Sequence, residues 1–327
     1  MRKRIVPTAL DAAIGEFVAH QRTFGRRYFT EEYNLKAFGR FVRRQRVTDL
    51  TAMVFERWCK SMRSLSPNTR YSRQLLVRKL CLFRRRRDPR CFIPDASGFA
   101  RPQPRRPPVI VTPQQVLGML GAADALPPSL QSPIRQASLR IAIVLLYTAG
   151  LRRGELVRLQ LADVDTHNGV LRIRESKFHK SRWVPLSNDA RRELRSYLSK
   201  RLTDDFDQRP AAPLLCHPGS GGRTQSYCGP ALREAINQVF KRADVHDVMG
   251  RRPRVQDVRH SFAVNALIRK YREGGDVQTH LPKLALYMGH VSIVSTAYYL
   301  HFIPEVAALA GERFSRRFSH LIDNGAS

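Results

Sequence analysis

A proline-rich, basic stretch divides this sequence into two parts. Five prolines fall within fifteen positions, at Pro94, Pro102, Pro104, Pro107 and Pro108. Because proline lacks the backbone N–H and fixes φ, neither a helix nor a central strand can continue through such a segment. We therefore predict a first domain at residues 1–95, a semi-extended linker at 96–108 and a second domain at 109–327.

The charge of the chain is strongly unbalanced. It holds 57 Lys and Arg against 27 Asp and Glu, which gives a formal net charge of +30. Residues 1–108 alone contain 26 basic and 8 acidic residues. Such an excess repels itself in a compact state, and a polyanionic partner explains it best. Nucleic acid is the favoured partner, and a membrane surface is the alternative.

The sequence predicts a soluble, cytoplasmic protein. The longest apolar run, around Ile141 to Leu146, is far shorter than the roughly 20 residues that a membrane span needs. Pro7, Asp11 and Glu16 interrupt any apolar core that a signal peptide would require. The five cysteines contain no Cys-x-x-Cys pair, so reduced thiols are expected and a zinc site is not.

Residues 1 to about 95 have the pattern of four short helices. Apolar residues recur at helical spacing from Ala9 to Gln21. Thr30, Thr51 and Ser66 are candidate N-caps for the next three helices, and Pro67 stands in the N1 position that proline favours. The first domain is therefore expected to be a small helical bundle.

The fourth of these helices carries many arginines and ends in four of them. A solvated face with cations at a helix C-terminus is one interpretation. With this net charge, contact with a phosphate backbone is the favoured one. The candidate DNA-binding residues of the helix and the linker are Arg70, Arg73, Arg84, Arg85, Arg86, Arg87, Arg105 and Arg106.

The second part is predicted to be mainly α-helical with a small antiparallel β-sheet. Thr112-Pro113 and Ser132-Pro133 are expected helix starts, and Gly150 is expected to follow the end of an apolar helix. Residues 170–173 and 183–186 are predicted strands around a polar turn. Further helices are expected at 151–159, from Ser187 to about 200, at 230–239 and at 255–270.

Five segments of this part carry a family resemblance. They are Thr148-Ala149-Gly150-Leu151-Arg152-Arg153-Gly154-Glu155-Leu156, Ser176-Lys177 with Val184-Pro185-Leu186, Asp257-Val258-Arg259-His260-Ser261-Phe262-Ala263, Met288-Gly289-His290 and Tyr299-Leu300-His301. In this order and at these separations they resemble the successive boxes of the tyrosine recombinase (phage integrase) family. The resemblance covers about residues 109–327. It implies a two-domain, C-shaped clamp, in which the helical first domain is similar in kind to the family's core-binding domain.

The resemblance implies a phosphodiester-cleaving site. Arg152 and Arg259 match the two arginines that neutralise the non-bridging oxygens, and His290 matches a donor to the same phosphate. Tyr299 matches the nucleophile, which leaves a 3′-phosphotyrosyl DNA and a free 5′-hydroxyl. Tyr298 is the alternative, but the spacing from His290 and the Tyr-x-His pattern favour Tyr299. Because the covalent link stores the bond energy, no cofactor, ATP or metal is expected.

Three further positions complete the implied site. Lys177, in the turn between the two strands, matches the general acid, with Lys180 as the alternate. Glu155, one helical turn after Arg152, is expected to orient the catalytic groups, with surface ion pairing as the alternative.

One position departs from the family pattern. Gln256 stands where the family usually has a histidine, and an amide cannot accept a proton near pH 7. His260 lies four residues further on the same helical face and is the residue that could compensate. We therefore expect cleavage to be slower than in members that have the histidine.

The function that the resemblance implies is site-specific recombination of double-stranded DNA through a Holliday junction. A homotetramer on DNA is expected, in a nucleoid-associated, prokaryotic-type setting. A last helix from Pro304-Glu305 either packs on its own domain or docks on a neighbouring protomer. The alternatives are a catalytically weakened DNA-binding accessory protein of a mobile element and a relaxing enzyme similar to type IB topoisomerases.

Overall fold

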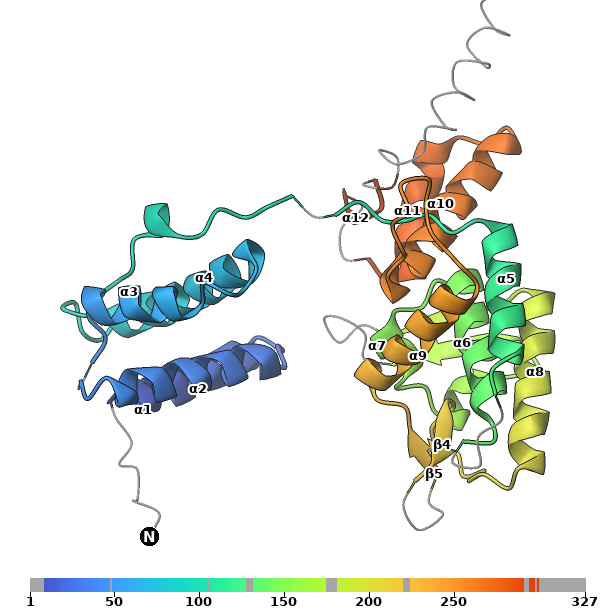
Figure 1. Ribbon diagram of the computed structural model, residues 1–327, viewed down its shortest axis with the longest axis horizontal. Helices are drawn as coiled ribbons and strands as arrows, with labels where there is room; N and C mark the ends of the chain where they lie inside the picture. The colour runs from blue at the N-terminus through green and yellow to red at the C-terminus, as the bar shows by residue number, and fades with distance from the viewer. Residues whose placement is uncertain are drawn as a thin grey trace, which may run out of the picture. The chain divides into compact units, whose positions relative to one another are not determined.

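The computed structural model describes residues 9–47, 49–104, 106–127, 132–174, 181–219, 224–290, 294–297 and 299. The chain forms two compact units, Met1–Arg106 and Pro107–Ser327, which are described separately below. Helices dominate both units, and the strands of the second unit are short and antiparallel (Figure 1). The predicted fold class, mainly α with a small antiparallel sheet, is confirmed.

The first unit is a bundle of four helices around one apolar core. The helices are α1 (Ala9–Thr23), α2 (Phe29–Arg44), α3 (Ala52–Ser61) and α4 (Pro67–Arg85). Their buried residues recur every three or four positions, as in Leu10, Ile14, Phe17 and Val18 of α1. Phe38 of α2 meets Trp58 of α3 edge-on, with ring centroids 4.8 Å apart.

The helix starts of the first unit match two of the three predicted caps. Thr51 Oγ1 accepts from the Val54 N–H, and Ser66 Oγ accepts from the Thr69 N–H. The prediction for Thr30 is wrong, because α2 already begins at Phe29. Its N-cap is Tyr28, which has a left-handed backbone (φ 54°) and makes no side-chain cap hydrogen bond.

The proline-rich segment begins as part of the first unit. It contains a three-residue 3-10 helix, Ala96–Gly98, and the side chain of Phe99 is buried in the core. The Ala100 N–H donates to Gln74 Oε1 at 2.9 Å, and the Gln103 N–H donates to Asn68 Oδ1 at 2.7 Å. Residues 96–108, which were predicted to be a linker, are therefore fixed on α4 as far as residue 103.

The second unit is built around a central helix, α6 (Arg135–Thr148), whose residues from Ile141 to Leu146 are all buried. No described helix of the chain combines the length and the apolar character that crossing a membrane would require. The other helices are α5 (Pro113–Asp124), α7 (Arg153–Leu156), α8 (Asn188–Thr203), α9 (Gly229–Arg242), α10 (Val255–Arg272), α11 (Val277–Met288) and α12 (Val294–Ala297). Helices α5, α8 and α10 pack against α6 (Figure 1).

Most predicted helix starts of this unit are confirmed. Thr112 and Gln115 form a capping box at α5, and Ser187 Oγ caps α8. The start predicted at Ser132-Pro133 is wrong: α6 begins at Arg135, with Ile134 as an N-cap that makes no side-chain bond. The helix predicted at 151–159 is shorter than expected, because only Arg153–Leu156 is helical.

The predicted hairpin is present and belongs to a three-stranded sheet of order β1-β2-β3. Strand β2 (Val170–Ile173) pairs antiparallel with β3 (Arg182–Pro185), so the second strand of the hairpin begins one residue earlier than predicted. Strand β1 (Val164–Asp165) was not predicted. Neither was the separate pair of β4 (Cys216–Pro218) with β5 (Thr224–Ser226).

Candidate active site

The first element of the site is the sharp turn between α6 and α7. Gly150 follows the end of α6 with φ 57°, and a Cβ at this position would lie 2.5 Å from the Phe262 ring. Only glycine fits there. The turn places Arg152 at the N-cap of α7, where its backbone N–H donates to Glu155 Oε2 at 2.9 Å and its Nη1 donates to Glu155 Oε1 at 2.7 Å.

Arg259, on α10, contacts the turn between α6 and α7, and its side chain is 1% exposed. Its Nη1 donates to the Gly150 carbonyl, and its Nη2 donates to the Met288 carbonyl at 2.6 Å. Burial and the neighbouring charge of Arg152 lower the pKa of Arg259 to about 9, so the guanidinium stays charged at neutral pH. Its buried Nε makes no hydrogen bond to any described residue.

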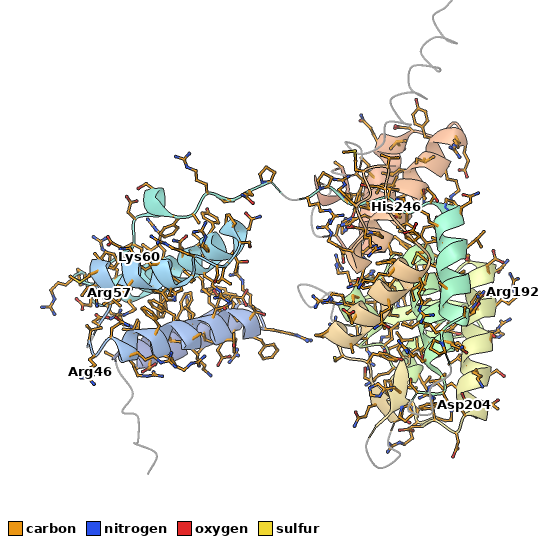
Figure 2. All side chains as sticks on the ribbon, viewed as in Figure 1. Arg46, Arg57, Lys60, Arg192, Asp204 and His246 are labelled. Atoms are coloured by element: carbon orange, nitrogen blue, oxygen red, sulfur yellow. The ribbon has the colours of Figure 1, made fainter. Side chains whose placement is uncertain are left out.

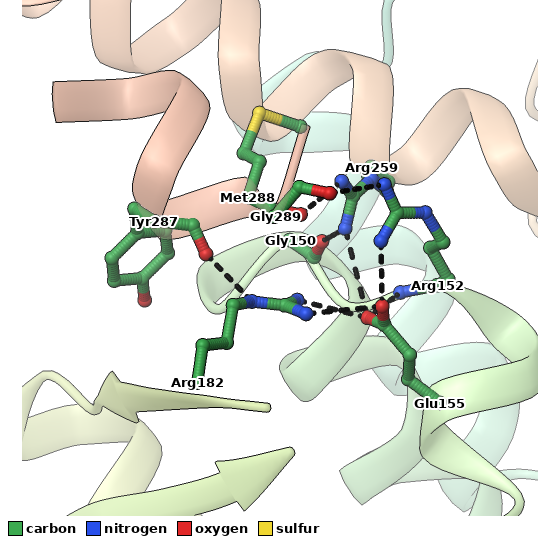
Figure 3. Close-up of polar contacts among 8 residues, drawn as sticks. All are labelled: Gly150, Arg152, Glu155, Arg182, Arg259, Tyr287, Met288 and Gly289. Atoms are coloured by element: carbon green, nitrogen blue, oxygen red, sulfur yellow. Dashed lines mark hydrogen bonds and ion pairs between the residues drawn. The ribbon is translucent and has the colours of Figure 1, made fainter. Parts of the chain in front are cut away.

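A single buried carboxylate holds the arginines together. Glu155 is 3% exposed and pairs with Arg152, with Arg182 and, at 3.8 Å, with Arg259. Burial alone would raise the pKa of Glu155, but the hydrogen bonds and charges of Arg182 and Arg152 outweigh it and lower that pKa to about 2. Glu155 thus contacts all three guanidiniums, and its role in orienting catalytic groups stays a prediction (Figure 3).

Sequence reasoning missed Arg182. This residue begins β3, donates from Nη1 and Nη2 to Glu155 and donates from Nε to the Tyr287 carbonyl at 2.8 Å. The signal that could have found it is strand alternation, because Arg182 and the buried Val184 share the inner face of β3 while Trp183 is exposed. An inward-facing arginine in a short strand requires a buried partner.

His290 follows directly after α11. Gly289 ends this helix in the left-handed region (φ 65°), and the His290 N–H then donates to the Ala285 carbonyl. His290 Nδ1 lies 2.7 Å from Thr296 Oγ1, a fully buried hydroxyl that the sequence did not single out. Burial and then the charges of Arg259 and Arg152 lower the pKa of His290 to about 4, so the ring is neutral at pH 7.

Tyr299 lies beside two histidines. The residue is 2% exposed, and its phenolic oxygen lies 2.9 Å from His260 Nδ1. Its ring is roughly parallel to that of His290, with centroids 6.2 Å apart. Burial is the largest cause that lowers the pKa of His260 to about 4, so His260 is neutral as well.

The remaining predicted residues divide between described and undescribed positions. Gln256 lies exposed in the first turn of α10, and its side chain makes no hydrogen bond to the described part of the chain. Lys177, Lys180, Tyr298, Arg105 and the segment from Pro304 lie outside the described residues.

The candidate DNA-binding arginines of the first unit differ in their burial and in the ion pairs that they form. Arg84 is bonded to both carboxylate oxygens of Asp49 and is 11% exposed, and Arg87 pairs with Glu16. Arg70 and Arg73 are partly buried, and Arg85, Arg86 and Arg106 are exposed.

The electrostatic balance of the site favours an anion. Three guanidiniums, those of Arg152, Arg182 and Arg259, surround one carboxylate, and both histidines are neutral at pH 7. The cluster thus carries an excess of two positive charges in a largely buried place, which is unfavourable without a negatively charged partner. Paired guanidiniums bind phosphate oxygens well.

Comparisons with solved structures place this fold among the recombinases. The XerH site-specific recombinase bound to a palindromic difH substrate matches with a TM-score of 0.61 at 16% identity, over 86% of this chain and 78% of that one. The Tn1549 transposon integrase in complex with transposon right-end DNA matches with a TM-score of 0.60 at 16% identity, over 88% of this chain and 93% of that one.

Sequence comparisons agree with the fold. The model of the phage integrase family matches residues 110–305. The putative integrase/recombinase y4rB of Sinorhizobium fredii is 31% identical over 94% of this chain and 97% of its own length. The tyrosine recombinase XerD of Mycobacterium tuberculosis is 31% identical over 67% of each chain. The chain belongs to the phage integrase family of tyrosine recombinases.

Proposed function

We propose that this protein is a site-specific DNA recombinase that cleaves and rejoins duplex DNA through Tyr299. One observation carries the proposal: Arg152 and Arg259 share the buried carboxylate of Glu155 next to His290, and Tyr299 packs against His290. The excess positive charge suits the scissile phosphate, and a tyrosine beside it suits nucleophilic attack. The DNA-bound relatives with the same fold support duplex DNA as the substrate.

In the proposed reaction, the phenolic oxygen of Tyr299 attacks the phosphorus and forms a 3′-phosphotyrosyl bond while the bond to the 5′-oxygen breaks. Arg152 and Arg259 donate to the non-bridging oxygens, whose negative charge grows in the transition state. Neutral His290 donates from one ring nitrogen to the same phosphate. Lys177 remains the proposed donor of the proton that the departing 5′-oxygen takes up.

We propose that His260 accepts the proton of the Tyr299 phenol when the phenolic oxygen attacks the phosphorus. Its Nδ1 already lies within hydrogen-bond distance of the phenolic oxygen, whereas Gln256 is exposed and cannot take up a proton. The low pKa of His260 makes the imidazole a weak base in the unbound protein. The positive charges of Arg254 and Arg259 are among the causes that lower the pKa of His260. The negative charge of a bound phosphodiester would offset them and raise that pKa.

We further propose that a groove between α2, α3 and α4 contacts the DNA backbone. Arg40, Arg44 and Arg73 line it together with Ser61 and Ser64. None of these three arginines has an ion pair among the described residues. Arg84 and Arg87, which the sequence analysis names as DNA-binding candidates, are each paired with a carboxylate. Arg46, Arg57 and Lys60 add to the positive charge of the same unit (Figure 2).

Trapping the covalent intermediate tests the proposed reaction. Nicked duplexes made from the DNA that flanks the coding sequence should accumulate a 3′-phosphotyrosyl adduct with the wild-type protein and none with Tyr299→Phe. Absence of the adduct on all such duplexes, with intact DNA binding, would favour an accessory DNA-binding protein instead. Relaxation of a supercoiled plasmid that carries none of this flanking DNA would favour a topoisomerase-like enzyme.

We also propose that the protein acts as a homotetramer on DNA. Strand exchange through a Holliday junction needs four active sites on two duplexes. Light scattering of the protein with a trapped junction should give four chains per complex, and one or two chains would contradict this assembly.

A further inference from the structure

Three arginines bind three successive carbonyls at the end of α11. Arg182 Nε donates to the Tyr287 carbonyl at 2.8 Å, Arg259 Nη2 to the Met288 carbonyl at 2.6 Å and Arg152 Nη2 to the Gly289 carbonyl at 2.9 Å (Figure 3). The last carbonyls of a helix lack intrahelical partners and carry partial negative charge. The guanidiniums therefore fix the point from which the chain continues to His290.

Arg182 differs from the other two arginines in how fully it is bonded. All three of its guanidinium nitrogens are engaged, two by Glu155 and one by the Tyr287 carbonyl, and its side chain is 10% exposed. Arg152 is 24% exposed and gives Glu155 only one side-chain nitrogen. Arg259 has a buried Nε without a hydrogen-bond partner among the described residues.

Because of this difference in bonding, the three arginines can serve different roles. A phosphate can bind Arg152 and Arg259 if they exchange a helix carbonyl for a phosphate oxygen. While Arg152 and Arg259 exchange these carbonyls for phosphate oxygens, another cation must hold the end of α11 in position and neutralise Glu155. Arg182 can do both, because it reaches Glu155 and the end of α11 from β3 and all three of its guanidinium nitrogens are already bonded there.

We infer that Arg182 is a positioning residue for DNA cleavage. It holds the carboxylate of Glu155 and the end of α11 in place, so that Arg152 and Arg259 are free to bind the scissile phosphate. Without Arg182, Glu155 would compete with the phosphate for the other two guanidiniums, and the segment that leads to His290 would lose one of its three anchors. This inference rests on the proposed function.

The test measures cleavage and DNA binding separately. The variants are Arg182→Met, Arg182→Lys and, as a matched control, Arg174→Met. Arg174 follows β2 and pairs with Asp163, another buried carboxylate, which contacts none of the arginines of the site. The measurements are the rate of covalent adduct formation on saturating nicked DNA from the flanks of the coding sequence, the Kd for that DNA and the melting temperature.

Arg182→Met is expected to slow adduct formation by about 10- to 100-fold, as for other groups that orient catalytic ligands, with Kd changed by less than about threefold. Arg182→Lys should recover part of the rate, and Arg174→Met should react at the wild-type rate. Equal slowing in Arg174→Met would show a purely structural effect and would overturn the inference. So would a wild-type rate in Arg182→Met.

Two further measurements keep the test decisive if Arg182→Met is unstable. Combining Arg182→Lys with Glu155→Gln should slow cleavage little more than Glu155→Gln alone, because the bidentate contact that lysine loses is the one with that carboxylate. Arg182→Lys should lose activity at a higher pH than the wild type on the acid side, because Glu155 loses hydrogen bonds that keep it ionised. Additive slowing together with an unchanged pH profile would overturn the inference. A wild-type protein that forms no adduct would refute the proposed function instead.

Discussion

His260 Nδ1 lies 2.9 Å from the phenolic oxygen of Tyr299, and the two residues are 39 positions apart in the sequence. The position at which the family usually has a histidine, Gln256, lies on the same helix as His260 and is exposed. The side chain within hydrogen-bond distance of the phenolic oxygen is thus not the one at the position where the family usually has a histidine.

This relationship predicts that His260→Asn slows adduct formation by about 10²- to 10⁴-fold, the usual range for loss of a general base. Asparagine can still form a hydrogen bond near the position of Nδ1 but cannot take up a proton. The rate on nicked DNA at saturation is the measurement. Gln256→His alone should react faster than the wild type. Gln256→His combined with His260→Asn should recover part of the rate that His260→Asn loses. A His260→Asn protein that cleaves normally would remove His260 from the mechanism.

The excess positive charge of the site predicts that a small oxyanion stabilises the protein. Inorganic phosphate, compared with chloride at equal ionic strength, should raise the melting temperature. A concentration of 100 times Kd corresponds to about 2.7 kcal/mol of added stability. Arg152→Met should reduce the rise, because it removes one guanidinium of the cluster. An equal rise in Arg152→Met would locate the bound phosphate elsewhere.

The two partly buried histidines of the site, His260 and His290, predict acid sensitivity. The pKa values of His260 and His290 are lowered to about 4 in the folded protein, below the ordinary value of 6.5. Between these values the unfolded chain binds more protons than the folded one, so stability falls as pH falls from about 6.5 to 4. Glu155 adds a second loss from its ordinary 4.5 down to about 2. Melting temperatures across this range should show the first loss in wild type and a smaller one in His260→Asn.

The groove on the first unit predicts a change in the salt dependence of DNA binding. Arg40→Ala and Arg44→Ala should each weaken binding and reduce the slope of log K against log salt by about 0.9. Arg43→Ala is the matched control on the same helix, because Arg43 already pairs with Asp11. Fluorescence anisotropy at several salt concentrations gives the slopes. A larger slope change in Arg43→Ala than in Arg44→Ala would place the DNA on a different face of the bundle.

Local sequence patterns were sufficient for elements whose signals are local. The caps at Thr51, Ser66 and Ser187 depend on hydrogen bonds that span three residues, and the hairpin of β2 and β3 depends on strand alternation. The same local reasoning failed at Thr30 and at Ser132, where the helices begin in turns without a side-chain cap.

The sequence by itself determined the family, the mainly helical fold and the likeness of Arg152, Arg259, His290 and Tyr299 to family positions, since motif order and charge are properties of the chain. Only the tertiary structure decided that Arg182 shares Glu155 with Arg152, that His260 holds the Tyr299 phenol and that Arg84 is already paired. Those contacts join residues that are 27, 39 and 35 positions apart. The packing that brings such residues together depends on the whole folded unit, and no local pattern encodes it.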